Sequence, residues 1–204
     1  MLNQDTLKVL GISGSLRQGS YNSAALRAAG ELLPEGMTLE TFSLREFPLY
    51  DEDVRQVGFP PVVQEFRQRI AAADALLIVT PEYNYSVSGV LKNAIDWASR
   101  PPEQPFHGKP IAIMGASPSM LGTARAQYHL RQMFVYLNGL VLNQPEVMIA
   151  DAPSKFDQEG KLTDSKTQEF IRKLLVALKH WTLLVSAGQR EMEQQASVAK
   201  ASAS

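Results

Sequence analysis

The chain has 204 residues, a formal net charge of −1, 45% hydrophobic residues and 20% charged residues, ordinary values for one globular domain with a substantial core. This near-neutral charge offers no general attraction for nucleic acid or anionic lipid, so a bound anion would need a local site. Cysteine is absent, which excludes disulfides, thiolate nucleophiles and iron–sulfur ligation. Redox chemistry would therefore require a bound organic cofactor.

No apolar run approaches the roughly 20 residues that a membrane helix needs. The first six residues lack the basic and apolar regions of a signal peptide. We therefore expect a cytoplasmic protein that has neither a membrane nor a nucleic acid as partner.

The first half of the chain predicts strands and helices in alternation. A strand over residues 7–12 ends in a glycine–serine loop, and a helix over 23–33 follows, capped by Ser20 or Asn22. A second strand is expected over 37–43. Residues 44–60 contain prolines, a glycine and several charges, which favours a long surface connection without regular structure. The next expected elements are a helix over 61–73 and a fully apolar strand over 75–80.

The second half continues the alternation. We expect a helix over 89–100, a strand over 111–116 and a helix over 123–137. A fifth strand over 140–149 contains Pro145, which indicates an edge position or an interruption. A last helix over 163–186 has a core-facing stripe at helical spacing, made of Phe170, Leu174, Ala177 and Trp181.

This order predicts an α/β fold in which a doubly wound, five-stranded parallel sheet lies between two helical layers. Residues 1–186 would form one such domain. Residues 187–204 are rich in Gln, Ala and Ser and show no core-forming periodicity. We expect this tail to be disordered, with a frayed helical extension as the alternative.

The loop after the first strand has the composition of a phosphate site. Its hydroxyl, amide and guanidinium donors are Ser13, Ser15, Arg17, Ser20 and Asn22, and Gly14 and Gly19 let the backbone close on a ligand. A Walker A loop would need lysine at the position of Ser20, and no dinucleotide fingerprint is present. The loop therefore fits a phosphomonoester, although a plain turn with a solvated arginine is the ordinary alternative.

The loop over residues 81–89 follows the central strand, where parallel sheets place ligand crevices. Tyr83 or Tyr85 could lie beside a flat ring, and backbone groups of Glu82, Tyr83 and Asn84 could pair with its polar edge. Ordinary packing explains either tyrosine equally well.

Four segments together carry a family resemblance. They are Gly-Ser-Leu-Arg-x-Gly-Ser-x-Asn at 14–22, Pro-Glu-Tyr-Asn-Tyr-Ser at 81–86, Gly-Val-Leu-Lys-Asn-Ala-Ile-Asp-Trp at 89–97 and Ala-Arg-x-Gln-x-His-Leu-Arg at 124–131. Over about residues 7–185 the chain resembles the NAD(P)H-dependent FMN reductases, and in particular their chromate and quinone reductase branch of flavodoxin-like fold.

The resemblance implies a bound FMN, NADH or NADPH as co-substrate, a small-molecule electron acceptor, and a homodimer or homotetramer. Ping-pong transfer to quinones would follow, with chromate, azo or nitro compounds as further acceptors and with no catalytic side chain. The expected FMN-binding residues are Ser13, Ser15, Leu16, Arg17, Gln18, Gly19, Ser20, Asn22, Pro81, Glu82, Tyr83, Asn84, Tyr85 and Ser117.

Ser88 departs from the resemblance, because relatives often have proline before this glycine, and we expect it to loosen the loop. Arg17, Arg100 and Arg125 could make the mouth of the cleft positive. The polar positions of the helix over 123–137 predict a solvated face or an oligomer surface; they are Arg125, Tyr128, Arg131 and Gln132.

Two other functions remain open from the residues alone. One is a flavodoxin-like electron carrier without nicotinamide reactivity, which the near-neutral charge disfavours. The other is a non-redox protein that uses the same fold. The three histidines have no metal-ligand spacing.

Overall fold

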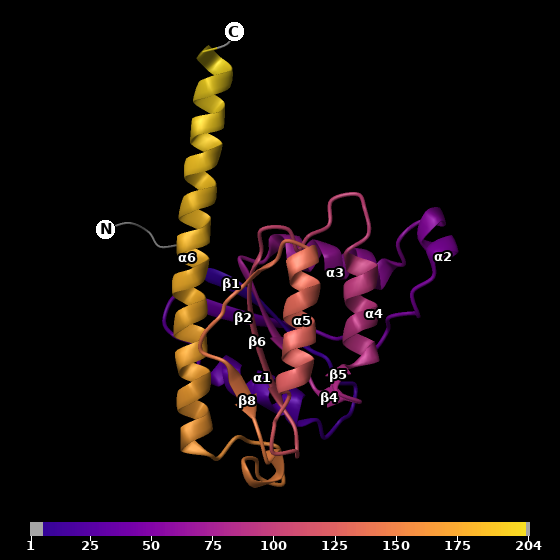
Figure 1. The fold of residues 1–204 in the computed structure, drawn as a ribbon, viewed down its shortest axis with the longest axis vertical. Helices are drawn as coiled ribbons and strands as arrows, with labels where there is room; N and C mark the ends of the chain where they lie inside the picture. Colours follow the sequence, from indigo (N-terminus) through magenta and orange to yellow (C-terminus); the bar gives the residue numbers. More distant parts are fainter. Residues whose placement is uncertain (1–5, 203–204) are drawn as a thin grey trace.

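A parallel sheet runs through the centre of the protein between two layers of helices (Figure 1). The computed structural model describes residues 6–202. Its elements, in chain order, are β1 Leu7–Ser13, α1 Tyr21–Glu31, β2 Met37–Phe42, α2 Glu52–Val57, α3 Pro61–Ala72, β3 Ala75–Val79, β4 Glu82–Tyr83, β5 Ser86–Val87, α4 Gly89–Ala98, β6 Pro110–Ala116, α5 Ala124–Tyr136, β7 Leu140–Val141, β8 Val147–Ile149, a 3-10 turn Ala152–Ser154 and α6 Ser165–Ser202.

The strands follow the order β2-β1-β3-β6-β7, with β8 also on β6, and every pairing among them is parallel. β3 and β6 are buried along their whole length, as expected of central strands covered on both faces. The chain winds outward from β1 in both directions. The predicted doubly wound sheet is confirmed, and the reversal of strand order beside β1 places a crevice at the carboxyl ends of β1 and β3.

The predicted fifth strand is two short strands. β7 pairs with the start of β6, and β8 pairs with its end. Pro145 lies between β7 and β8 and has no N–H to donate to a ladder. The sequence indicated either an edge position or an interruption, and the structure has both.

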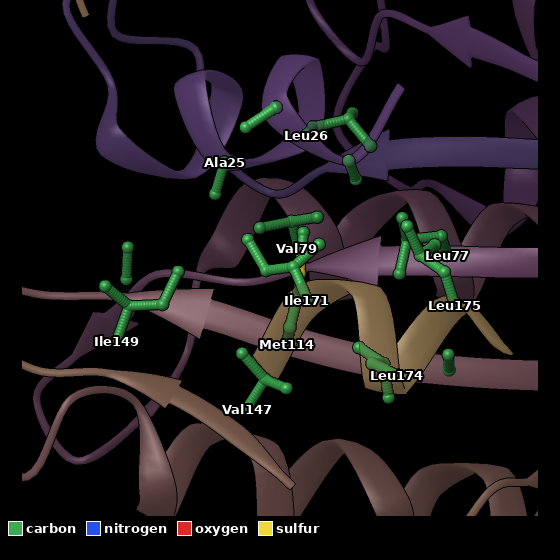
Figure 2. Close-up of a cluster of buried hydrophobic side chains, with 14 of the residues drawn as sticks. Ala25, Leu26, Leu77, Val79, Met114, Val147, Ile149, Ile171, Leu174 and Leu175 are labelled. Atoms are coloured by element: carbon green, nitrogen blue, oxygen red, sulfur yellow. The ribbon is translucent and has the colours of Figure 1, made fainter. Parts of the chain in front are cut away.

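Each face of the sheet carries its own hydrophobic core. α1 and α6 cover one face, where Figure 2 shows Leu26 of α1 and Leu174 of α6 packed against Val79 and Met114 of the sheet. α3, α4 and α5 cover the other face. Because helices cover both faces, the crevice at the strand ends lies among the loops that follow β1, β3 and β6.

Residues 44–60 are not wholly irregular, contrary to our expectation. They contain the short helix α2, which begins where the Asp51 carboxylate accepts a hydrogen bond from the Asp53 N–H (2.9 Å). The segment is anchored to α4, because the side chains of Asn93 and Trp97 both donate to the Pro48 carbonyl (2.8 and 3.0 Å). The sequence did not predict α2, because a six-residue helix is too short to give a periodic hydrophobic pattern and lies among prolines and charged residues.

The buried face of α6 differs from the predicted stripe. Phe170 is exposed, and Trp181 is half-buried at the rim, where its indole N–H donates to the Leu140 carbonyl (2.8 Å). Branched aliphatic side chains take the core positions: Ile171, Leu174, Leu175 and Leu178. The aromatic residues were therefore wrong markers of this face, because their large surface and polar edge also suit a half-exposed rim.

Residues 187–202 continue α6 as helix, which matches the helical extension that we gave as the alternative to a disordered tail. The residues from 187 to 199 are exposed, and this end of α6 stands clear of the sheet (Figure 1). Ala, Gln, Glu and Met favour helix, and extending an existing helix avoids the cost of nucleation. Although α6 has 38 residues, no helix between residues 6 and 202 is long and apolar enough to cross a membrane.

Candidate functional site

Three loops meet at the carboxyl edge of the sheet around a cavity of about 180 Å³. They follow β1, β3 and β6. The cavity is lined by Ser15, Arg17, Ser20, Tyr21, Asn22, Pro81, Glu82, Tyr83, Ala116, Ser117 and Pro118. Eight predicted residues are therefore brought together, while Ser13, Leu16, Gln18, Gly19, Asn84 and Tyr85 do not line this cavity. The sequence did not point to Tyr21, which is a variable position inside the 14–22 motif, or to Ala116 and Pro118, which flank Ser117.

Gly14 holds the first two loops together. Its N–H donates to the Val79 carbonyl (2.9 Å), and its own carbonyl accepts a hydrogen bond from the Ser88 hydroxyl (2.6 Å). A side chain at position 14 would meet Pro81 Cδ and Ser88 Oγ at 3.1 Å. Glycine is therefore required here by the close approach of two segments.

Ser88 joins the hairpin loop to Gly14, and the looser loop that we expected relative to proline stays a prediction. Besides donating to Gly14, its hydroxyl accepts the Leu91 N–H (3.3 Å) and caps α4. The side chain is buried. Serine therefore replaces the rigidity of proline with two hydrogen bonds.

The phosphate-type loop, residues 14–22, has free donors on the cavity wall and in the part of the loop beside it. The Ser20 hydroxyl caps α1 by accepting the N–H groups of Asn22 and Ser23 (3.2 and 3.3 Å), which leaves its own proton available. Within residues 6–202, the N–H groups of Gln18 and Gly19 donate to no protein acceptor. These donors and the positive end of α1 point to an anion.

Arg17 is the one cation on the cavity wall without an ion pair among the described residues. Its guanidinium lies near Gly19, with Nη2 at 3.8 Å from the position of a Cβ there. A planar fork of donors suits a phosphate group. The residue is exposed, so it can move toward a ligand.

Asn22 and Ser13 act within the protein. The Asn22 amide donates to the Ala116 carbonyl (2.9 Å) and accepts the Ala116 N–H (2.8 Å), which ties the start of α1 to the end of β6. The Ser13 hydroxyl is hydrogen-bonded to that of Ser23 (3.0 Å). We expected donors to a ligand at both positions, and the structure shows that the Asn22 amide is already paired.

The ring-type loop is a hairpin. β4 and β5 pair antiparallel, with Tyr83 opposite Ser86. The two turn residues Asn84 and Tyr85 have φ of 51° and 65°, the left-handed conformation that a two-residue type I′ turn requires. Tyr85 is an unusual choice for this conformation. Its ring is held by the guanidinium of Arg125, whose Cζ lies 3.6 Å from the ring centroid.

Glu82 fixes the hairpin to α5. Its carboxylate accepts the backbone N–H groups of Arg125 (3.0 Å) and Ala126 (3.2 Å) and forms a salt bridge with the Arg125 guanidinium. The Glu82 side chain is only 5% exposed. The negative charge therefore stabilises the N-terminus of α5, and backbone contacts between the hairpin and a flavin ring stay a prediction.

Of the three arginines that we expected at the mouth of the cleft, only Arg17 gives it an uncompensated positive charge. Arg125 is neutralised by Glu82. Arg100 lies beyond the far end of α4, where it donates to the Asp96 carbonyl (3.1 Å) and the Ser99 hydroxyl (3.1 Å). The loop over residues 81–89 lies at the start of α4, and Arg100 follows its end, so the length of α4 lies between them. Arg17 alone remains.

These features together fit a flavin phosphate. The cavity contains one unpaired cation, several free donors and a single carboxylate that is already neutralised. An anion with an attached polar chain can therefore bind without meeting an uncompensated negative charge.

Comparison with known proteins agrees with this geometry. Residues 7–154 match the NADPH-dependent FMN reductase family. The chain belongs to this family. It is an oxidoreductase enzyme with FMN as cofactor and NAD(P)H as co-substrate, which confirms the predictions of enzyme class and cofactors.

The chain is 63% identical over 177 residues to an NAD(P)H-dependent FMN reductase of Pseudomonas aeruginosa, covering 87% of this chain and 96% of that protein. It is 45% identical over 176 residues to a quinone reductase of Escherichia coli, covering 85% and 94%. A solved structure of FerB, a flavoenzyme NAD(P)H:(acceptor) oxidoreductase from Paracoccus denitrificans, matches with a TM-score of 0.79 and 33% identity, covering 86% and 97%. A flavodoxin of Pseudomonas aeruginosa matches at a TM-score of 0.56 and 18% identity, covering 85% and 99%. The flavodoxin-like fold is confirmed.

Proposed function

We propose that this FMN reductase transfers electrons from NAD(P)H to quinones, with both substrates using the same cleft in turn. The observation that carries the proposal is the cavity at the carboxyl edge, which is lined by a free arginine, by loop hydroxyls and by a hairpin that a salt bridge fixes to α5. Relatives named quinone reductase and 2-hydroxy-1,4-benzoquinone reductase support the acceptor class. Chromate, azo and nitro compounds are proposed as further acceptors.

In this proposal Arg17, Ser15, Ser20 and the free N–H groups of Gln18 and Gly19 hold the FMN phosphate. The backbone of Glu82, Tyr83 and Asn84 would hold the flavin ring, together with Ser117 in the loop after β6. Bound FMN supplies the hydride-accepting and hydride-donating chemistry. The protein supplies position, and the salt bridge between Glu82 and Arg125 keeps the hairpin fixed and its carboxylate charge away from the ring.

The decisive experiment is an anaerobic titration of the FMN-loaded protein with NADPH and NADH, followed by addition of a quinone. We expect the visible flavin absorbance to bleach and then to return. Steady-state rates at several quinone concentrations should give parallel double-reciprocal lines. Flavin that does not bleach would reject the proposal, and intersecting lines would reject the shared cleft.

We further propose a homodimer or homotetramer. Three apolar side chains on α5 are exposed, at 54% for Tyr128, 81% for Val135 and 86% for Tyr136. Such a surface suits a protein–protein contact. Arg125 and Arg131, which we expected on the same face, instead bind Glu82 and the Leu142 carbonyl (2.9 Å). Light scattering after gel filtration tests the oligomeric state. The cytoplasmic location stays a prediction.

A further inference from the structure

A second cavity, of about 300 Å³, lies on the other side of the phosphate-type loop, between the carboxyl ends of β1 and β2 and the side of α1. Ser15 and Arg17 line both cavities, so this loop forms the wall between them. The other residues of the second cavity are Ser13, Leu16, Ser23, Leu26, Arg27, Thr41, Phe42, Ser43, Leu44 and Arg45.

All charged side chains that line this cavity are positive. Arg17, Arg27 and Arg45 line it, and no aspartate or glutamate does. This concentration is local, because the whole chain carries a net charge of −1. Within residues 6–202 none of the three arginines forms a salt bridge, whereas Arg55, Arg69 and Arg125 each have a glutamate partner.

The three guanidinium groups retain donors for a ligand. Arg45 donates to the Leu16 carbonyl through Nη2 (2.5 Å), and Arg27 reaches the Gly160 carbonyl only at 3.5 Å. Since each guanidinium has five N–H donors, most of them are unused. The contact between Arg45 and Leu16 also fixes the segment after β2 against the phosphate-type loop.

Hydroxyl groups complete the donor set. The paired hydroxyls of Ser13 and Ser23 lie between β1 and α1, and one of their two protons is left over after they bond to each other (3.0 Å). Thr41 in β2 and Ser43 just after it add two more hydroxyls to the lining. Arginine with hydroxyl donors and without carboxylates is the chemistry of a phosphate site.

We propose that this second cavity is an anion site, distinct from the flavin site, that binds a phosphate group through Arg27 and Arg45. Its volume lies at the small end of ligand pockets, which leaves room for a phosphate with a small attached group. The phosphate could belong to NADPH, whose 2′-phosphate distinguishes it from NADH, or to a free phosphorylated compound. The first of these sources rests on the proposed function.

The site is tested on protein saturated with FMN, so that the flavin phosphate cradle is filled. Inorganic pyrophosphate is the probe, and potassium chloride at equal ionic strength is the blank. We expect pyrophosphate to raise the melting temperature above the chloride value. Arg27→Gln should weaken pyrophosphate binding about tenfold, the loss of one charge-assisted contact, with FMN affinity unchanged. Arg45→Gln should weaken it similarly. Arg69→Gln, outside the cavity, should bind pyrophosphate as the parent does.

A melting temperature that responds equally to pyrophosphate and chloride would overturn the proposal, as would an unchanged response in both cavity variants. The KM values for NADPH and NADH distinguish the two possible sources of the phosphate. If NADPH supplies the phosphate, Arg27→Gln raises the KM for NADPH about tenfold and leaves that for NADH unchanged. If a free compound does, both KM values stay unchanged while the pyrophosphate response is lost. The melting measurement needs no turnover, so it stands even if the quinone reaction is not observed.

Discussion

The loop after β1 and the hairpin after β3 lie on the same edge of the sheet, and they use their side chains in opposite ways. In the first loop, the Arg17 guanidinium and the N–H groups of Gln18 and Gly19 are left without protein partners in the described chain. In the hairpin, Glu82 and Tyr85 are both engaged by Arg125. A phosphate is recognised by charge, which needs free donors. A flat ring is recognised by position, which needs a fixed backbone.

This comparison predicts that substitutions in the two regions change flavin binding in different ways. Substitutions in the first loop should weaken binding of the phosphate and leave binding of the ring unchanged. Damage to the hairpin should weaken FMN and riboflavin equally, because both carry the same ring. The ratio of the FMN and riboflavin dissociation constants is therefore the measurement that separates them.

The largest effect is expected for Gly14→Val, because this residue joins both regions. Its new side chain would clash with Pro81 and Ser88 and push the loops apart. We expect FMN affinity to fall about 100-fold and the free energy of unfolding to fall by about 1–3 kcal/mol. Gly19→Ala is the matched control, since only Arg17 Nη2, at 3.8 Å, lies near its Cβ position. Equal losses in the two variants would contradict the steric explanation.

Arg17→Gln should have the next largest effect. Losing a charged hydrogen bond to phosphate costs about 1.5–3 kcal/mol, so the FMN dissociation constant should rise about 10- to 100-fold. Riboflavin has no phosphate, and its affinity should not change. Isothermal titration with both flavins measures the difference. A parallel loss of riboflavin affinity would show that Arg17 acts on loop structure instead.

Glu82→Gln should weaken both flavins to the same extent. The variant removes a carboxylate that is 5% exposed and leaves Arg125 and two helix N–H groups with a weaker acceptor. We expect the free energy of unfolding to fall by about 2 kcal/mol in urea denaturation. Glu52→Gln, at an exposed salt bridge in α2, is the control and should be close to neutral. A selective loss of FMN over riboflavin would contradict the division between the regions.

Ser88→Ala is expected to have the smallest effect. It removes the cap of α4 and the bond to Gly14, which should cost about 1 kcal/mol in unfolding free energy and weaken both flavins slightly. Ser88→Pro tests the same position, because Ser88 has φ of −64°, which proline can adopt. If Ser88→Pro restores the stability that Ser88→Ala loses, rigidity is what this position supplies.

The alternation of elements, the parallel sheet and the two loops of the candidate site could all be predicted from the sequence. These follow from hydrophobic runs of β3 and β6, from helix caps such as Ser20 and from glycine and proline at turns, which are local signals. The family resemblance rested on the same local motifs. The hydrogen-bond and ion-pair partners of the side chains, in contrast, come from distant parts of the chain and are not encoded in local motifs.

Which donors are free became visible only in the three-dimensional arrangement of the chain. Asn22 and Arg17 look alike as candidate ligands in the sequence, but Asn22 is paired with Ala116, 94 residues away, and Arg17 is not paired. Arg100 lies at the far end of α4, away from the loops of the site. The charge of Arg125 is neutralised by Glu82, which comes from another segment of the chain. The second arginine cavity also appeared only when β2 was placed beside β1. Hydrogen bonding and charge pairing depend on neighbours in space, and the order of residues along the chain does not specify those neighbours.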